Sequence, residues 1–208
     1  MSAAIDEIPL TWETPRAWAS GALENPLELL IDHAHCELGA ASTAQTLIVR
    51  YADIDPLVDR FSALAAEELR HFRRVHRLLR ERGGVLRAPG PNPYAGGLVR
   101  AIDRSAPEAL VDRLIVSGLI ERRSLERFEL LAEACTDVQM GEMFRELGPS
   151  EMGHAIMFID LARVLFPAVD VDQRLAQWTQ HEGEWIAGLP FASRIHSGPP
   201  RDGERNHE

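Results

Sequence analysis

The sequence predicts an all-α protein, a bundle of four long helices with a short additional helix near the C-terminus. Three observations support this fold class. Strand signals are nearly absent from the 208 residues, apolar side chains recur at the three-and-four spacing of one helix face, and start signals precede the long periodic stretches. A chain of this length can fill one sizeable core, so we expect a single domain over 1–208.

The first two long helices have clear start and stop signals. A helix at about 26–52 follows Asn25-Pro26, and a helix at about 56–82 follows Asp55-Pro56. An N-cap side chain followed by proline in the first turn is typical of a helix start. Gly83-Gly84 can end the second helix through a left-handed residue. These two helices are expected to form a hairpin.

The second half of the chain repeats this pattern. Ser105-Ala-Pro-Glu108 fits a capping box for a helix at about 107–134, and a weaker box over 136–139 precedes a helix at about 138–165. A shorter helix follows at about 172–187. Residues 83–106 form the one long connection, and two hairpins joined by a long crossover describe the ferritin-like four-helix bundle. Residues 1–24 are expected to be an N-terminal extension and 189–208 an irregular tail.

Composition narrows the class of protein and its compartment. The net charge of −10 argues against a surface that coats nucleic acid everywhere, but it leaves room for a local basic patch. Two cysteines make no disulfide framework. No apolar run approaches the length of a membrane span, and the N-terminus lacks the pattern of a signal peptide. We therefore expect a cytoplasmic protein.

Six polar side chains interrupt the apolar stripes of the four long helices, in the order Glu, Glu-x-x-His, Glu, Glu-x-x-His. They are Glu37, Glu68, His71, Glu121, Glu151 and His154. The two halves are spaced almost alike, because 31 residues separate Glu37 from Glu68 and 30 residues separate Glu121 from Glu151. This near-repeat is expected if each hairpin contributes half of one site.

The pattern indicates a dinuclear metal centre. Residues three apart share one face of a helix, so Glu-x-x-His offers a carboxylate and an imidazole together. Four carboxylates and two imidazoles that project into a bundle are the ligand set of a dinuclear iron or manganese site, and two divalent ions can neutralise four buried carboxylates. With 20 Glu and 8 His, about one Glu-x-x-His is expected by chance. A third copy, Glu204 to His207, lies in the polar tail and is interpreted as chance.

Other titratable residues near the ligands are interpreted as outside the site. Solvation is favoured for Glu67, which points about 100° away from Glu68. Glu126 and Glu129 lie off the stripe that holds Glu121. Solvation is also favoured for the titratable residues near Glu37, which are Asp32, His33 and His35. One of these three could instead contact a ligand. Asp160 could support the fourth helix's ligands, whereas Cys36 is expected to pack rather than bind metal, because a carboxylate-rich site suits harder metals.

Four segments resemble the tRNA 2-methylthio-N6-isopentenyladenosine hydroxylases, in the order "HAHCELGAAS", "EELRHF", "LIERRSLERF" and "SEMGHA". The resemblance extends to "TPRAW", to "YAGGLVRAI" in the crossover and to "RIHSGPP" near the end. A metal site alone needs none of these last three. The family comprises ferritin-like diiron monooxygenases that hydroxylate the isopentenyl group of a modified adenosine beside the anticodon.

The resemblance implies two iron ions on the same six ligands, O2 as co-substrate, and no catalytic residue beyond the ligands. Electrons would come from a separate reductase or ferredoxin, since no nucleotide-binding glycine motif lies near a strand. The chain would act as a monomer or a small homo-oligomer. One departure from the family pattern is Gly148-Pro149, which should kink or restart the fourth helix just before its ligands.

A tRNA substrate requires a basic face on this acidic chain, and arginines supply a candidate. They cluster on the second helix and after the ligand on the third: Arg70, Arg73, Arg74, Arg77, Arg80, Arg122 and Arg123. Phosphate binding by such a cluster would depend on salt. The alternative is a solvated helix face paired with surface acids. Similarly, "RIHSGPP" could shape the entrance for the base, or it could simply pack across the bundle.

Three other functions remain open from the sequence. An iron-storage protein shares the ligands but requires a large hollow oligomer. A diiron oxidase or hydroxylase that acts on another substrate would have the same metal site, but its arginines would not bind tRNA. A non-enzymatic helical bundle would bind no metal, which metal analysis would decide.

Overall fold

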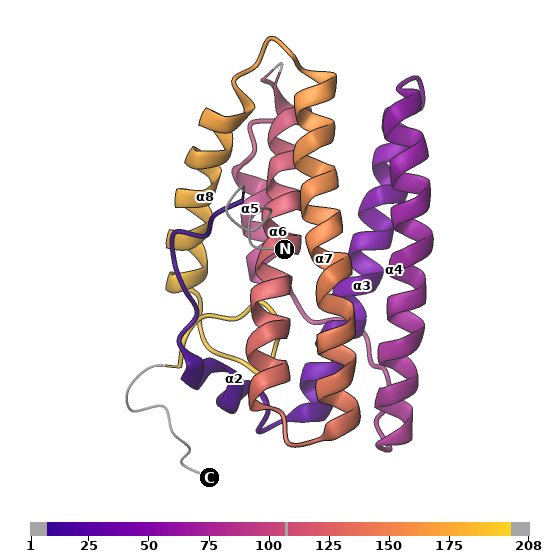
Figure 1. Ribbon diagram of the computed structural model, residues 1–208, viewed down its shortest axis with the longest axis vertical. Helices are drawn as coiled ribbons and strands as arrows, with labels where there is room; N and C mark the ends of the chain where they lie inside the picture. The colour runs from indigo at the N-terminus through magenta and orange to yellow at the C-terminus, as the bar shows by residue number, and fades with distance from the viewer. Residues whose placement is uncertain (1–7, 107, 201–208) are drawn as a thin grey trace. The chain divides into compact units, whose positions relative to one another are not determined.

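The computed structural model describes residues 8–106 and 108–200, and within these ranges the chain forms seven α-helices and no β-strand (Figure 1). The helices are α2 (Arg16–Ala22), α3 (Pro26–Arg50), α4 (Asp55–Glu81), α5 (Pro93–Ala101), α6 (Ala109–Ala134), α7 (Val138–Leu165) and α8 (Val171–Gly188). The chain divides into two compact units. Residues 25–90 form the hairpin unit, and residues 1–24 together with 91–208 form the larger unit.

In the hairpin unit, α3 and α4 pack against each other along their lengths (Figure 1). α4 is strongly amphipathic, with one buried apolar stripe that includes Phe61, Leu64 and Val75. The helix ends as predicted at Gly83, whose φ of 76° is a left-handed conformation. The amide of Gly83 donates to Arg80 O and that of Gly84 donates to Leu79 O, so the last carbonyls of the helix are satisfied.

In the larger unit, α6 and α7 form a second hairpin, and α2, α5 and α8 each contact α6. A buried cluster joins α5, α6 and α8 through Tyr94, Leu98, Val116 and Ile186. Because these helices and the hairpin partner α7 all lie against it, α6 is buried over most of its surface. α6 is therefore the central helix of this unit.

The five predicted helices are present, with bounds that differ by one or two residues. Two helices were not predicted. α2 is short and follows Pro15, and α5 lies inside the predicted crossover and contains Gly96 and Gly97, which weaken the helix signal.

Three predicted caps were placed wrongly. The N-cap of α6 is Glu108, whose side chain makes no capping bond, while the Ser105 hydroxyl and amide both donate to Asp103 Oδ1. Asp55 lies inside the first turn of α4, after an N-cap at Ile54. Asp137, rather than its neighbour Thr136, caps α7 by accepting from the Met140 amide. Only α7 therefore has a side-chain cap among these three helices, and its donor partner lies one position after the predicted one.

The two predicted irregular ends are integral to the larger unit over the residues described. Ile8 and Trp18 are buried in the N-terminal segment, and Ile195, His196 and Ser197 are buried in the tail. The tail thus packs across the helices of the larger unit, which is one of the two roles predicted for "RIHSGPP". The expected single domain over 1–208 stays a prediction.

Two further features of the fold concern membranes and the chain ends. No helix in the part of the chain that the structure describes is long and apolar enough to cross a membrane. The third Glu-x-x-His, Glu204 to His207, lies outside the described residues.

Candidate metal centre

The hairpin unit brings three of the six predicted ligands into direct contact. Glu37 comes from α3, and Glu68 and His71 come from the same face of α4; all three are buried. The His71 Nδ1 atom lies 3.4 Å from Glu68 Oε2 and 3.6 Å from Glu37 Oε2. The i, i+3 spacing on α4 and the antiparallel pairing with α3 thus focus two carboxylates on one imidazole. We refer to these three residues as the first triad.

The charge of the first triad shifts the pKa values of its members. Burial alone raises the pKa of the Glu37 carboxyl, but hydrogen bonds with His33 and His71 outweigh it and hold that pKa far below its ordinary value. Burial alone lowers the pKa of His71, whereas the hydrogen bonds and charges of Glu37 and Glu68 raise it to about 10. Two buried carboxylates thus favour a positive charge on the imidazole between them, and Glu37 is further stabilised as a carboxylate by His33.

His33 is a buried partner of a ligand, which the sequence analysis weighed but did not favour. Its Nε2 atom lies 2.6 Å from Glu37 Oε1, and its side chain is 1% exposed. The expected solvation of His33 is therefore wrong. The i, i+4 spacing to Glu37 was the available signal, and an imidazole that fixes a ligand carboxylate is typical of metal sites. The neighbouring His35 instead contacts the carbonyl oxygen of Arg87.

The larger unit carries the other three predicted ligands, which we call the second triad. Glu121 lies on α6, and Glu151 and His154 lie on α7, all of them buried. A carboxylate oxygen of Glu121 and a ring nitrogen of His154 lie within 4.8 Å of each other. α6 and α7 approach closely beside them, because a Cβ atom added to Gly118 would lie 3.2 Å from the carbonyl oxygen of Ala155.

α7 does not restart at Gly148-Pro149. The helix runs continuously from Val138 to Leu165 with Pro149 inside it, so the restart is wrong, and a kink at this point stays a prediction. The larger unit has a pocket of about 540 Å³ at this point, lined by Leu125, Glu129, Ala132, Glu133, Phe144, Arg145, Gly148, Pro149 and Met152. Tertiary packing against α6 can hold a helix through a proline that propensity alone would not tolerate. The departure from the family pattern therefore coincides with a pocket rather than with a break.

The remaining acids and the cysteine lie where the sequence analysis placed them or have other partners. The Glu67 side chain is 37% exposed, as predicted, but its Oε1 atom also lies 3.8 Å from His71 Nε2. Asp160 is half-exposed and pairs with Arg163, which removes Asp160 as support for the predicted ligands. Glu126 is not solvated: its carboxylate accepts from Thr14 and Arg123. Cys36 lies half-buried on α3, where its thiol donates to Asp32 Oδ2 at 3.8 Å.

The predicted arginine cluster separates into exposed and buried members. Arg70, Arg73, Arg77 and Arg80 are exposed on α4, with Arg74 half-buried among them; we call these five residues the α4 arginine face. They lie on the helix whose buried face carries Glu68 and His71. As phosphate contacts, they stay a prediction.

Arg122 and Arg123 are buried, and their assignment to an exposed tRNA-binding patch is wrong. The Arg123 side chain is fully buried and pairs with Glu182 of α8. Arg122 donates from Nε to the carbonyl oxygen of Ile8. Both guanidinium groups are thus used inside the larger unit, by partners 59 and 114 residues away in the chain, which no local pattern indicates.

The donor set of the two triads fits iron or manganese. Each triad offers two carboxylates and one imidazole, and no thiolate belongs to either. Carboxylate and imidazole ligands suit these metals, while thiolate-rich sets suit zinc and copper(I). The positive charge that the first triad favours is one that a metal ion supplies.

Comparison with known proteins gives one family. A family model described as tRNA-(MS[2]IO[6]A)-hydroxylase (MiaE) matches residues 3–197. A tRNA 2-(methylsulfanyl)-N(6)-isopentenyladenosine(37) hydroxylase from Pseudomonas putida is 38% identical over 188 residues, which cover 90% of this chain and 91% of the relative. The hydroxylase of the same description from Salmonella typhimurium is 29% identical, covering 91% of this chain and 88% of the relative.

A solved structure supports the fold class. It is described as protein 43 with aldehyde deformylating oxygenase activity from Synechococcus, and it is 35% identical, with a TM-score of 0.85 that covers 94% of this chain and 98% of that chain. The all-α, ferritin-like fold class predicted from the sequence is confirmed by this likeness and by the seven helices described.

Proposed function

Because the chain belongs to the tRNA-(MS[2]IO[6]A)-hydroxylase family, it is a tRNA-modifying monooxygenase, and we propose that its chemistry takes place at a dinuclear iron centre held by both triads. The substrate is the isopentenyl group of 2-(methylsulfanyl)-N6-isopentenyladenosine next to the anticodon. The observation that carries the proposal is the repeat of one buried Glu and one buried Glu-x-x-His in each helical hairpin.

The metal assignment rests on charge and on ligand chemistry. Four carboxylates carry four negative charges, which two divalent ions balance, and the two imidazoles complete the set. The six ligands are Glu37, Glu68, His71, Glu121, Glu151 and His154. When bound, the iron pair supplies the activation of O2 that inserts an oxygen atom into a C–H bond, with electrons from a separate reductase or ferredoxin.

The protein's own residues hold and shield this centre. All six ligands are buried, so water has little access, and electrostatic interactions inside the site are strong. His33 holds the Glu37 carboxylate through its 2.6 Å contact. The helix faces that carry the ligands belong to two hairpins, so each ligand is positioned by a long helix rather than by a loop.

The α4 arginine face is the proposed docking surface for tRNA. Exposed arginines on one helix face can pair with successive phosphates. Arg122 and Arg123 are buried, so this surface does not include them. The modified adenosine would have to leave the anticodon loop to reach a buried centre, as bases do in other enzymes that act on them. We further propose a cytoplasmic monomer or small homo-oligomer.

The test uses the purified full-length chain loaded with iron(II), with O2, a chemical reductant and tRNA that bears 2-methylthio-N6-isopentenyladenosine. Nucleoside mass spectrometry should find one added oxygen atom on the modified nucleoside. Glu68→Ala and His154→Ala should abolish this gain and lower the iron content, because each removes a ligand. If both variants keep two irons and full activity, the ligand assignment is wrong.

Two further arms separate the alternative functions. A long-chain aldehyde serves as a second substrate, because the similar Synechococcus protein is described by a deformylating activity; conversion of the aldehyde without hydroxylation of tRNA would refute the proposed substrate. Size determination tests iron storage, since a large hollow oligomer that accumulates many irons would favour a storage protein over a hydroxylase.

A further inference from the structure

α6 is buried over most of its surface, so its apolar stripe does not fix its rotation in the way that the stripe of an ordinary surface helix does. Leu110, Val111 and Val116 are all buried, although they point in different directions around the helix axis. α4 differs, because a single apolar stripe dictates which of its faces is buried. Hydrophobic burial alone therefore does not determine how α6 is rotated about its own axis. Other contacts must fix the rotation that points Glu121 at its partners.

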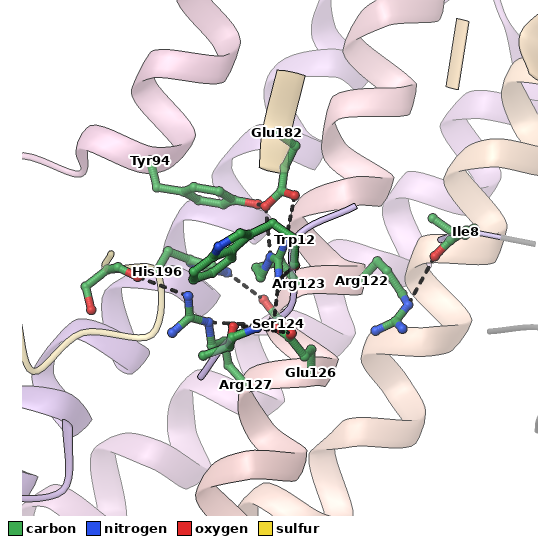
Figure 2. Close-up of polar contacts among 12 residues, drawn as sticks. Ile8, Trp12, Tyr94, Arg122, Arg123, Ser124, Glu126, Arg127, Glu182 and His196 are labelled. Atoms are coloured by element: carbon green, nitrogen blue, oxygen red, sulfur yellow. Dashed lines mark hydrogen bonds and ion pairs between the residues drawn. The ribbon is translucent and has the colours of Figure 1, made fainter. Parts of the chain in front are cut away.

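Directional polar contacts on another face of α6 can make this selection. Arg123 donates from Nε to Glu182 Oε1 at 2.9 Å and from Nη2 to Glu182 Oε2 at 2.7 Å (Figure 2). Both side chains are fully buried. The Tyr94 hydroxyl donates to the same Glu182 Oε1 atom at 2.8 Å. This bidentate pair has fixed geometry, which a point-like charge or an apolar contact does not provide.

The remaining donor of Arg123 connects α6 to the N-terminal segment. Its Nη1 atom donates to the carbonyl oxygen of Trp12 at 2.9 Å and to Glu126 Oε2 at 2.7 Å. Glu126 in turn accepts from the amide of Thr14 at 2.8 Å and from its hydroxyl at 2.6 Å. Figure 2 shows Glu182, Trp12 and Glu126 around Arg123. The Arg123 side chain is thus held directly by α8 and the N-terminal segment, while α5 holds its partner Glu182 through Tyr94.

One turn further along α6, the tail makes equivalent contacts. Arg127 donates from Nη2 to the carbonyl oxygen of Ser197 at 3.0 Å, and its guanidinium carbon lies 3.9 Å from the centre of the Trp18 ring. Ser124 contacts the ring of His196 at 3.1 Å. Three segments therefore meet on this side of α6, although a metal site has no direct use for them: "TPRAW", "YAGGLVRAI" and "RIHSGPP".

The position of Arg123 relative to Glu121 connects these contacts to the metal centre. Two residues correspond to about 200° around a helix, so Arg123 and Glu121 lie on nearly opposite faces of α6. A side chain that ends ~6 Å from the helix axis moves roughly 2 Å when the helix rotates by about 20°. Ligand positions tolerate shifts of only about 0.5 Å, so a small rotation is enough to disturb the centre.

We propose that the Arg123–Glu182 pair, with Tyr94 and the Trp12 carbonyl, is a positioning device that fixes the rotation of α6 and so aims the Glu121 carboxylate at the metal site. The inference rests on the proposed function, because it takes Glu121 as a ligand. Arg123 and Glu182 touch neither metal nor substrate. A buried ion pair contributes little net stability compared with apolar residues of similar volume, but it can select one arrangement among several.

The larger unit offers a matched control pair. Asp112 of α6 accepts from Arg174 of α8 at 2.7 Å and 2.8 Å, which is also a bidentate contact between the same two helices. Asp112 is nine residues before Glu121, so it is more than two turns away from the ligand. Loss of this pair should weaken the contact between α6 and α8 without rotating the part of α6 that carries Glu121.

The experiment compares three full-length proteins: wild type, the double variant Arg123→Met with Glu182→Leu, and the control Asp112→Asn. Thermal unfolding of the metal-free proteins measures stability. Cobalt(II) titration then measures the number of ions bound and their visible absorption spectrum. We expect the double variant to bind fewer than two ions or to show a changed spectrum, while the control binds two ions with the wild-type spectrum, even where its loss of stability is equal or larger.

Two results would overturn the inference. The double variant could bind two ions with the wild-type spectrum, or metal binding in both variants could decline in proportion to stability alone. A metal-free crystal structure of the double variant gives an independent readout. The closest ligand atoms of Glu121 and His154, which lie within 4.8 Å of each other here, should separate beyond that limit; an unchanged separation refutes positioning. Glu121→Ala tests the proposed function separately, because wild-type metal binding in that variant would remove Glu121 from the ligand set.

Discussion

The same substitution at two glycines of the second hairpin should have opposite effects. A Cβ atom at Gly118 of α6 would lie 3.2 Å from the Ala155 carbonyl oxygen, 3.2 Å from Ile159 Cδ1 and 3.3 Å from Phe158 Cβ. A Cβ atom at Gly153 of α7 would meet nothing within 4 Å. Gly118 lies one turn before the ligand Glu121, and Gly153 lies between the ligands of α7, so both are close to the second triad.

The magnitudes follow from helix propensity and packing. Gly153→Ala should stabilise the protein by ~1 kcal/mol, the ordinary difference between glycine and alanine inside a helix. Gly118→Ala gains the same propensity but overpacks a contact with a backbone oxygen, which costs about 1–3 kcal/mol. The two variants should therefore differ by about 1–3 kcal/mol, or roughly 2–12 °C in Tm for a chain of this size.

Thermal unfolding of the metal-free proteins measures this difference, and iron content measures its consequence. Gly118→Ala should also lower iron binding, because it pushes α6 away from α7 beside Glu121 and His154, whereas Gly153→Ala should bind iron like the wild type. Equal Tm values for the two variants would refute the close packing of α6 on α7 and, with it, the account of how the second triad is positioned.

The remaining predictions concern a helix end, a buried hydroxyl and the docking surface. Gly83→Ala should destabilise the protein by about 1–2 kcal/mol in thermal unfolding, because the φ of 76° disfavours a Cβ atom; an unchanged Tm would contradict this. Tyr94→Phe should cost about 1–3 kcal/mol, since a hydrogen bond to a buried carboxylate is lost. Burial, with the charge of Glu182, raises the pKa of Tyr94 well above 10.0, so the unfolded chain loses this proton first and stability should fall as the pH rises above 10. Urea titrations at several pH values measure the free energy of unfolding, and the decrease due to Tyr94 should be absent from Tyr94→Phe. Arg73→Glu with Arg77→Glu should weaken tRNA binding and lower its salt dependence by about one unit of slope per lost phosphate contact, with no change in Tm. Arg60→Glu, which is also exposed on α4, is the control, and equal losses from both changes would remove the α4 arginine face as a specific surface.

The helices, and the grouping of the predicted ligands within each hairpin, were accessible from the sequence because both depend on local spacing. Glu68 and His71 share a face of α4 by the i, i+3 rule, and the apolar stripe around them places that face inside. Each triad then follows from the antiparallel pairing within its own hairpin. His33 was weighed among the residues near Glu37 and was predicted to be solvated, because spacing shows that two residues can touch but does not show that both are buried.

The contacts on the other face of α6 could not be predicted, because they join residues far apart in the chain. Arg123 looked like a surface cation, and only the arrangement of α8 shows that Glu182 neutralises it, 59 residues later. The Trp18 indole donates to Ser197 Oγ across 179 residues. The N-terminal segment and the tail have weak local patterns, and their order comes from these long-range contacts.

The central claim is that the two triads together hold one pair of iron ions, and magnetic coupling tests it most directly. The full chain is loaded with iron(II), oxidised, and studied by iron analysis, Mössbauer spectroscopy and EPR. The account predicts two irons per chain as an antiferromagnetically coupled pair, which is silent in EPR when diferric and gives a mixed-valent signal after one-electron reduction. Two magnetically isolated ferric ions, each with a mononuclear high-spin signal, would contradict it, because each triad would then bind its own ion.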